Sequence, residues 1–319
     1  MTNSPAQAVV GLDISKKQLD IAVRPQGLSF TAPNTEAGIA RLLRRLQKLN
    51  PQLIVLEATG GYEFLLVAAL AREDLPVAVV NPHQVREFAR AAGRQAKTDK
   101  LDAQVLAHFG EAMRPEPRPL PTPEQQQLTA LMRRRGQILG MILREKNRLE
   151  QTHIDAVRRD IRENLTWLER RLKQMEKDIQ ALIHQSPLWR EKDCLLQSVP
   201  GIGPVIARTL ITYVPELGAL SGREVASLIG VAPFNRDSGR FKGKRMIRGG
   251  RGHVRCLLYM GALVATRFNE IIRDFYQRLL AAGKPKKLAL TACIRKLLLI
   301  LNAMLKKQQP WQPFATQKA

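Results

Sequence analysis

The sequence is poor in cysteine, in aromatic rings and in acidic side chains. Its three cysteines, Cys194, Cys256 and Cys293, lie far apart in a chain of 319 residues. That spacing excludes a disulfide-based scaffold and argues against a structural zinc site. The first residues lack a signal-peptide pattern, and the longest apolar stretch, 288–305, is interrupted by Arg295 and Lys296. We therefore expect a soluble cytoplasmic protein without a membrane partner.

The shortage of acid leaves a large positive charge. Lys and Arg number 51 against 28 Asp and Glu, which gives a formal net charge of +23. Such a balance indicates a polyanionic partner, and nucleic acid is the one we favour. Residues 1–110 carry 13 basic and 10 acidic side chains, a net of +3, so the rest of the chain carries +20. We interpret this as a near-neutral first domain followed by basic domains that hold nucleic acid.

The first third of the chain alternates between strand and helix patterns. Residues 8–23 are typical of two strands joined by a turn, and residues 53–56 and 77–80 form short apolar runs. Helical patterns stand between these runs, with Asn34 or Thr35 as the first cap and Pro82 opening the last helix. This alternation predicts an α/β layer with a largely parallel part.

Four carboxylates stand out in this domain. Asp13 lies inside the first apolar strand, Glu57 ends a later one, and Asp99 and Asp102 share one face of a helix start. An aspartate in an apolar strand is costly unless a cation compensates it. Carboxylate oxygens suit Mg²⁺ or Mn²⁺. Each residue alone could be a solvated turn, a lysine partner or a helix-start acid; together they favour a metal site.

A second candidate site is the basic segment 233–255. It holds eight Lys and Arg side chains and one acid, Asp237, so it cannot form a packed core. One interpretation is a solvated loop that only grips phosphate; the other assigns phosphate chemistry to its hydroxyl, Ser238. The cations expected to meet phosphate are Arg236, Arg240, Lys242, Lys244, Arg245, Arg248 and Arg251. A third signal, SVPGIGPVIA at 198–207, matches a helix-hairpin-helix in which Gly201 and Gly203 allow backbone amides to hold a phosphate.

The middle of the chain differs from the first third in its proline content and in the spacing of its apolar residues. Residues 114–123 contain five prolines, which predicts a stiff linker. The apolar residues that follow recur in steps of three and four, which predicts an antiparallel coiled coil with its turn near 156–161. An intramolecular hairpin with a solvated face and a dimerisation arm both fit this pattern.

Several motifs together resemble one family. They are VGLDISKKQLDIAV, VLEATGGYE, NPHQVREFARAAGRQAKTDKLDAQVLA, SVPGIGPVIA and LIGVAPFNRDSGRFKGKRMIRGGRGHVRCLLYMGALVA. Between about residues 8 and 305, the chain resembles the DEDD-type insertion-sequence transposases, also described as bridge-RNA-guided recombinases, which include the pilin-gene invertases. The resemblance implies an RNase H-like (RuvC-like) domain whose acidic tetrad is Asp13, Glu57, Asp99 and Asp102. It also implies a C-terminal transposase domain whose catalytic serine is Ser238.

The resemblance further implies a domain order and a reaction. We expect the RuvC-like domain at 1–112, the linker at 113–123, coiled-coil helices at 124–186, and a mainly α transposase domain with the helix-hairpin-helix at 187–319. The enzyme would excise and insert a mobile element by RNA-guided cleavage and exchange of DNA strands. It would use Mg²⁺, or Mn²⁺, and a covalent phosphoserine, in a site shared between subunits.

The expected partners are donor and target DNA, a structured guide RNA from the element, and further copies in a homodimer or homotetramer at the nucleoid. The alternative is a metal-dependent Holliday-junction-type nuclease that uses water, with Ser238 only a phosphate contact. A non-catalytic regulator is a third hypothesis, against which the intact tetrad argues.

Overall fold

The chain folds into two compact units, residues 1–126 and 127–319. The structure, a computed structural model, describes residues 8–57, 62–93, 99–117, 121–234, 237–238, 241–243 and 245–312. The four-part division expected from the sequence is finer than these two units and stays a prediction.

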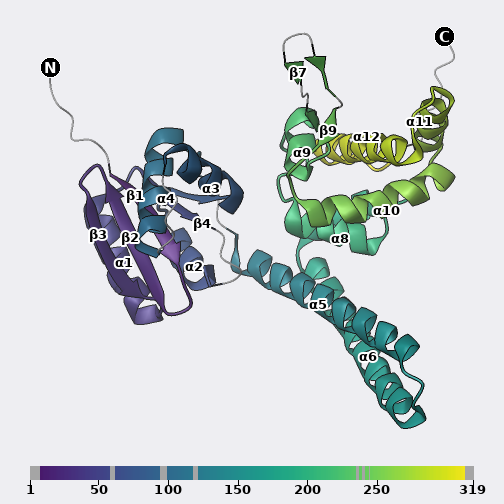
Figure 1. Cartoon of the computed structure of the whole chain (residues 1–319), viewed down its shortest axis with the longest axis horizontal. Coiled ribbons are helices and arrows are strands. Elements are labelled where there is room, and N and C mark those ends of the chain that lie inside the picture. Colours follow the sequence, from purple (N-terminus) through teal and green to yellow (C-terminus); the bar gives the residue numbers. More distant parts are fainter. Residues whose placement is uncertain are drawn as a thin grey trace. The chain divides into compact units, whose positions relative to one another are not determined.

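The N-terminal unit is a five-stranded mixed sheet with helices on both faces (Figure 1). Its strands are β1 (Val9–Ile14), β2 (Gln18–Arg24), β3 (Leu28–Pro33), β4 (Leu53–Glu57) and β5 (Val77–Val80). Its helices are α1 (Glu36–Leu49), α2 (Phe64–Arg72), α3 (Pro82–Ala91) and α4 (Asp99–Met113). The strand order is β3-β2-β1-β4-β5, antiparallel in the first hairpins and parallel from β1 through β4 to β5. The predicted α/β domain with a parallel part is confirmed.

Alternation along the strands divides the apolar side chains between two cores. Val10, Leu12 and Ile14 of β1 pack with side chains of α1 and α2 on one face. Val9 of β1 and Val55 of β4 pack with α3 and α4 on the other. Because successive side chains of a strand point to opposite faces, residues 9, 11 and 13 of β1 all face α4. This rule decides where Asp13 points.

The C-terminal unit is almost entirely helical among its described residues. Its helices are α5 (Pro123–Gln151, beginning at the end of the first unit), α6 (Asp155–Gln185), α7 (Pro187–Gln197), α8 (Pro204–Tyr213), α9 (Gly222–Ile229), α10 (Gly252–Phe268), α11 (Glu270–Ala281) and α12 (Lys286–Lys307). Two short strand pairs stand between α9 and α10. A large apolar core joins α7 to α12 with the adjoining ends of α5 and α6.

Helices α5 and α6 form an antiparallel hairpin that extends from this unit as an arm (Figure 1). Ile138, Ile142, Ile161, Leu165 and Leu168 form its apolar seam. The turn lies at residues 152–154, so the predicted position near 156–161 is wrong. The guanidinium of Arg158 donates to the carbonyl of Leu149, in the last turn of α5, and to that of Thr152, in the turn that follows. The coiled-coil description of this hairpin stays a prediction.

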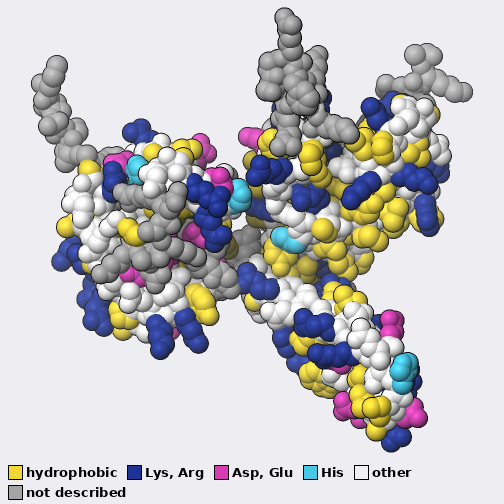
Figure 2. Space-filling model, viewed as in Figure 1, with side chains coloured by type: hydrophobic (Ala, Val, Ile, Leu, Met, Phe, Trp, Pro, Cys, Tyr) yellow, Lys and Arg dark blue, Asp and Glu magenta, His cyan; other side chains and the backbone are white. Residues whose placement is uncertain are grey.

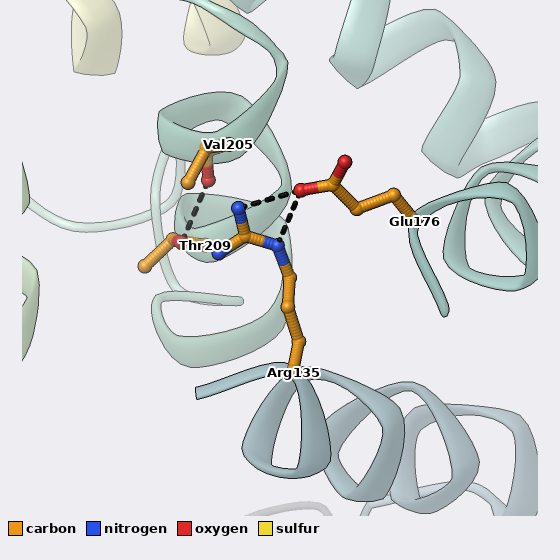
Figure 3. Close-up of polar contacts among 4 residues, drawn as sticks. All are labelled: Arg135, Glu176, Val205 and Thr209. Carbon is orange, nitrogen blue, oxygen red and sulfur yellow. Dashed lines mark hydrogen bonds and ion pairs between the residues drawn. The ribbon is translucent and has the colours of Figure 1, made fainter. Parts of the chain in front are cut away.

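An ion pair joins the two helices of the arm where they meet α8. Arg135 of α5 donates through Nε and Nη2 to Oε1 of Glu176 in α6, at 3.0 and 2.7 Å (Figure 3). The Arg135 side chain is only 15% exposed. The poorly hydrated guanidinium thus has a carboxylate partner, and the pair links α5 to α6.

Helix α12 lies in the core of the C-terminal unit. It is long and apolar enough to cross a membrane, but 56% of its most apolar window is buried inside the unit. The sequence predicts that Cys256 and Cys293 are small buried hydrophobic side chains, and Cys293 on α12 is buried. The same expectation for Cys256 is wrong, because Cys256 lies on an exposed position of α10.

Candidate active site

Two of the four predicted carboxylates stand side by side at the carboxyl ends of parallel strands. Leu12 of β1 is paired with Leu56 of β4, so Asp13 and Glu57 occupy the next position on each strand. Neighbouring strands are about 4.8 Å apart, which makes these two residues direct neighbours. Both continue the rows of side chains that face α4, and both are partly exposed. The strand ends therefore present two acids to one helix.

A glycine allows α4 to lie directly on β1. An ideal Cβ at Gly11 would stand 2.2 Å from the carbonyl oxygen of Ala103 and 2.3 Å from the amide nitrogen of Ala107. Only a residue without Cβ permits this approach of two backbones. Further along α4, an ideal Cβ at Gly110 would stand 2.7 Å from a side-chain methyl group of Val9 and 2.7 Å from one of Val55. From its N-terminus to its C-terminus, α4 therefore runs from Gly11 toward Val9, which makes it antiparallel to β1.

This direction puts the first turn of α4 at the strand ends. Asp102 stands immediately before Ala103, Asp99 precedes it by four residues, or about 6 Å along the helix, and Asp102 is partly exposed. The side chain of Asp99 lies outside the described side chains. The positive end of the helix dipole lies at the same place and favours nearby carboxylates. All four tetrad positions thus belong to one edge of one unit, while their catalytic and metal-binding roles stay predictions.

A fifth carboxylate, which the sequence interpretation missed, borders the site. Asp20 of β2 is paired with Asp13 across the β1–β2 hairpin and is only 2% exposed. The Nε2 of Gln18 donates to both of its carboxylate oxygens, at 3.1 and 3.0 Å. Two like charges directly opposite in a sheet repel each other. The sequence carried a signal, since Asp20 interrupts an apolar strand as Asp13 does.

Asn34 ties together the two loops that follow these strand ends. Its Nδ2 donates to the carbonyl oxygens of Ser15, at 2.9 Å, and Tyr62, at 3.2 Å. Its backbone amide donates to the carbonyl of Lys17, at 2.9 Å. Thr35, not Asn34, caps α1 by accepting from the amide of Gly38. The Asn34 side chain is therefore available to join the segments after β1 and β4, which carry Asp13 and Glu57.

The donor set fits a hard divalent cation. Every candidate ligand is a carboxylate, and oxygen ligands are those that Mg²⁺ and Mn²⁺ prefer. Among the described side chains, no three of His, Cys, Asp or Glu form a ready-made metal cluster. The described part of the tetrad consists of Asp13, Glu57 and Asp102, and each of these has a polar interaction within the chain.

Ser238 lies on a hairpin in the other unit. Strands β7 (Asp237–Ser238) and β8 (Phe241–Lys242) pair antiparallel, with Ser238 opposite Phe241. Below them, β6 (Pro233–Phe234) pairs with β9 (Met246–Ile247). The side chains of Ser238 and Lys242, and the whole of Arg236, Arg240 and Lys244, lie outside the described part of the chain. Arg245 and Arg248 are exposed beside β9.

Two arginines of the basic segment hold in place the residues from which its hairpin extends, referred to below as the base of the hairpin. Arg251 makes a two-pronged ion pair with Glu216, both contacts at 2.7 Å. Nη1 of Arg255 donates to the carbonyls of Ile229, Gly230 and Gly249, at 3.1, 3.2 and 2.7 Å. The Arg255 contacts join the end of α9 to α10, and the Arg251 pair joins the start of α10 to the segment between α8 and α9. Arg251 therefore has a structural task here, and its predicted nucleic-acid contact stays untested.

Next to this base, the ring of His253 packs edge to face on Tyr213 with centroids 4.5 Å apart. Partial burial, together with the nearby Arg251 guanidinium, lowers the pKa of His253. Partial burial raises the pKa of Tyr213, an effect that Arg133 opposes. Both rings are thus neutral at pH 7, so the positive charge of this region comes from its lysines and arginines.

The two glycines of the predicted helix-hairpin-helix differ in their surroundings. Gly201 has a φ of +104°, and a Cβ there would lie 2.7 Å from the carbonyl oxygen of Gly261 and 2.8 Å from Cβ of Ala265. Packing against α10 therefore explains Gly201 without a nucleic acid. Gly203 begins α8 without a side-chain cap, and nothing lies within 4 Å of its ideal Cβ. Phosphate binding at this turn stays a prediction.

Two family models match the chain. Residues 10–158, which include the whole carboxylate edge, match the DEDD model for IS110 elements, described as a transposase. Residues 193–277, which include the basic hairpin, match a model described as the transposase of the IS116/IS110/IS902 family. The two matches follow each other along the chain and fall on the two candidate sites.

Curated relatives agree with these models. The chain is 28% identical over 322 aligned residues to the pilin gene-inverting proteins of Moraxella lacunata and Moraxella bovis; the alignments cover 96% of this chain and 98% of each relative. It is 30% identical over 157 residues to an uncharacterized 44.8 kDa protein of insertion element IS116 from Streptomyces clavuligerus. That alignment covers 48% of this chain and 38% of the relative.

Proposed function

We propose that this chain cleaves and rejoins DNA strands through a serine nucleophile assisted by divalent cations. The chain belongs to the IS110/IS116 transposase family and is thus an enzyme of DNA transposition and recombination. The observation that supports this best is the arrangement around Gly11. There, β1, β4 and the first turn of α4 bring Asp13, Glu57, Asp99 and Asp102 to one edge of the sheet. In our proposal this unit has an RNase H-like (RuvC-like) fold.

Each carboxylate has a task in this proposal. Asp13 and Glu57, fixed on adjacent strands, and Asp99 and Asp102, on the helix, hold the cations; Mg²⁺ is our choice and Mn²⁺ an alternative. When bound, the cations supply Lewis-acid stabilisation of charge on the phosphate oxygens. Gly11 and Asn34 keep strand ends and helix at the spacing that this requires.

Ser238 carries the covalent step. Its Oγ forms a bond to phosphorus while the bond from phosphorus to one sugar oxygen breaks. The serine proton is lost to solvent, and the released sugar oxygen takes up a proton. A hydroxyl of the partner strand then attacks the phosphoserine, releases the serine and joins the strands, so the number of phosphodiester bonds is conserved. Arg236, Arg240, Lys242, Lys244 and Arg245 neutralise the charge that grows on phosphate.

The finer features of the proposal come from the family resemblance. The carboxylates and Ser238 belong to different units, and we propose that a site combines one subunit's carboxylates with another subunit's serine in a dimer or tetramer. A structured guide RNA selects donor and target DNA by base pairing, while the protein contacts backbone and shape. The α5–α6 arm acts as a coiled coil, the 198–207 turn as a helix-hairpin-helix, and the enzyme works at the nucleoid in the cytoplasm.

The test is a search for the protein–DNA adduct. Purified protein is mixed with element-end RNA, end-labelled target DNA and Mg²⁺, and the products are separated on denaturing gels. We expect a protease-sensitive adduct with the native sequence and none with Ser238→Ala or Asp13→Asn. In a parallel thermal scan, Mn²⁺ should raise the melting temperature of Ser238→Ala as it does that of the native protein, but raise that of Asp13→Asn much less.

The two variants separate this mechanism from hydrolysis by water. Free nicked DNA that Ser238→Ala produces at the native rate, without adduct, would favour the Holliday-junction-type nuclease. An equal melting response to Mn²⁺ in Asp13→Asn would remove Asp13 from the metal site. Omitting the RNA tests the guide: cleavage at the same positions without it would rule out guidance.

A further inference from the structure

Two glycines in the middle of α5 have no packing neighbour, among the described residues, that would require glycine. Gly136 and Gly140 lie one turn apart on this 29-residue helix, and nothing stands within 4 Å of an ideal Cβ at either position. Glycine is a poorer helix former than alanine because it leaves more backbone freedom to lose on folding. Alanine would therefore fit and would stabilise the helix. The missing side chains leave room for something outside the chain to approach the α5 backbone.

Arginines surround this open backbone. A shallow, open surface depression on α5 is lined by Arg133, Arg134, Gly136, Gln137, Gly140, Met141 and Arg144. The three arginines are exposed, whereas the adjacent Arg135 turns away to Glu176. No acidic residue occurs between Glu124 and Glu145, so every charged side chain that α5 carries between them is cationic. Figure 2 shows Lys and Arg side chains gathered along the arm.

The charge and length of this face decide what fits it. Arg133 and Arg144 are eleven residues apart, or about 16 Å along a helix that rises 1.5 Å per residue. One small anion cannot contact both, but a polymer with repeated negative charge can. The same face of a second copy is a poor partner, because it would bring two sets of arginines together. The chain belongs to a DNA-recombining family, so a DNA backbone supplies the complementary charge.

We propose that the glycine-arginine face of α5 is a docking surface for the phosphate backbone of duplex DNA. A sugar-phosphate strand lies over Gly136 and Gly140, and Arg133, Arg134 and Arg144 neutralise its phosphates. This inference rests on the proposed function of the enzyme on DNA, but it adds a contact outside the carboxylate edge, the basic hairpin and the 198–207 turn. Such backbone contacts position DNA without reading its sequence.

Fluorescence anisotropy of a labelled random-sequence duplex of about 30 base pairs, measured in EDTA from about 50 to 200 mM KCl, tests the surface. EDTA separates binding from cleavage. The variant is Arg133→Gln/Arg134→Gln/Arg144→Gln. Its control, Arg159→Gln/Arg162→Gln/Arg170→Gln, removes the same charge from exposed positions of α6. We expect the slope of log K against log salt to fall by about 3 in the α5 variant, because each phosphate contact contributes about 0.9, and to change far less in the control.

A second variant, Gly136→Ala/Gly140→Ala, separates docking from stability. It should melt at a higher temperature than the native protein and yet bind the duplex more weakly, since its methyl groups occupy the approach path. Equal losses in the α5 and α6 triple variants would overturn the proposal, and so would alanines that stabilise the helix without weakening binding. The proposal would also be overturned if the α5 triple variant bound a matched RNA duplex more weakly than the native protein does but bound the DNA duplex equally well. That result would assign the face to RNA. None of these outcomes affects the adduct assay for Ser238.

Discussion

Placing a single methyl group at Gly11 should damage both the stability and the activity of the enzyme. An ideal Cβ there lies 2.2 Å from the Ala103 carbonyl oxygen, and ordinary contact begins near 3.4 Å. In Gly11→Ala, α4 must therefore retreat by roughly 1.2 Å, a shift that the buried cluster of Ala22, Ala103 and Ala107 must absorb. Both clashing atoms belong to the helix backbone, so no side-chain rotation relieves the overlap.

The expected magnitudes follow from that shift. Overpacking of this kind lowers the free energy of unfolding by about 1–3 kcal/mol. A displacement of about 1 Å between catalytic groups reduces turnover by about 10²-fold, and here it separates Asp99 and Asp102 from Asp13 and Glu57. We would measure urea denaturation of the full chain and adduct formation per folded molecule at saturating Mg²⁺.

The control is Gly27→Ala in the turn between β2 and β3. Gly27 has a φ of +68° and open space around its ideal Cβ, so alanine there meets only backbone strain of about 1–2 kcal/mol. Its activity per folded molecule should stay native. A native urea midpoint for Gly11→Ala would contradict the predicted clash, and a destabilised Gly11→Ala that forms adduct at the native rate would contradict the link between this spacing and catalysis.

Three further predictions concern other contacts. Asn34→Asp keeps the side-chain shape but loses the two hydrogen bonds that Nδ2 donates to Ser15 and Tyr62. We expect the free energy of unfolding to fall by about 1–3 kcal/mol and half-maximal adduct formation to need a higher Mg²⁺ concentration. An unchanged Mg²⁺ titration would limit the role of Asn34 to folding. Glu176→Gln leaves the poorly hydrated Arg135 without its carboxylate and should clearly lower the urea midpoint. In the control Lys146→Gln, the lysine and its partner Glu169 are equally exposed, so the free energy of unfolding should fall by less than about 1 kcal/mol. Similar losses in both variants would contradict the importance of burial. Burial raises the pKa of Cys293 to about 11. At pH 8, iodoacetamide should therefore modify the exposed Cys194 and Cys256 in the native protein, and Cys293 only after denaturation. Rapid labelling of all three cysteines would show that α12 opens readily.

Local patterns in the sequence were sufficient for the elements of the N-terminal unit. Alternation and short apolar runs are consequences of burial on one or both faces of a strand, so they mark β1, β2, β4 and β5 without any knowledge of neighbours. The same reasoning singled out Asp13 and Glu57, because a charge in an apolar strand needs an explanation wherever the strand lies. The composition also indicated a polyanionic partner before any fold was known.

Register and helix direction required the tertiary structure. Asp20 became part of the carboxylate edge only when the β1–β2 pairing put it opposite Asp13. Gly11 carries no local signal and Asn34 only that of a helix cap, because their roles consist of contacts with Ala103 and Tyr62, which lie far away in the sequence. A glycine or an asparagine in a loop has many possible reasons, and its neighbours in space select one.

The basic segment shows most clearly where sequence information ends. Counting its charges indicated a surface for phosphate, and Arg245 and Arg248 are exposed as that count implies. The count could not tell that Arg251 binds Glu216 or that Arg255 holds three carbonyls at the base of the hairpin. The sequence by itself thus determined the kinds of chemistry that the chain can perform, because residue type sets charge, ligand and nucleophile. The tertiary structure decided which of those groups stabilise the fold and which remain on its surface, because a side chain's partner depends on what folding brings near it.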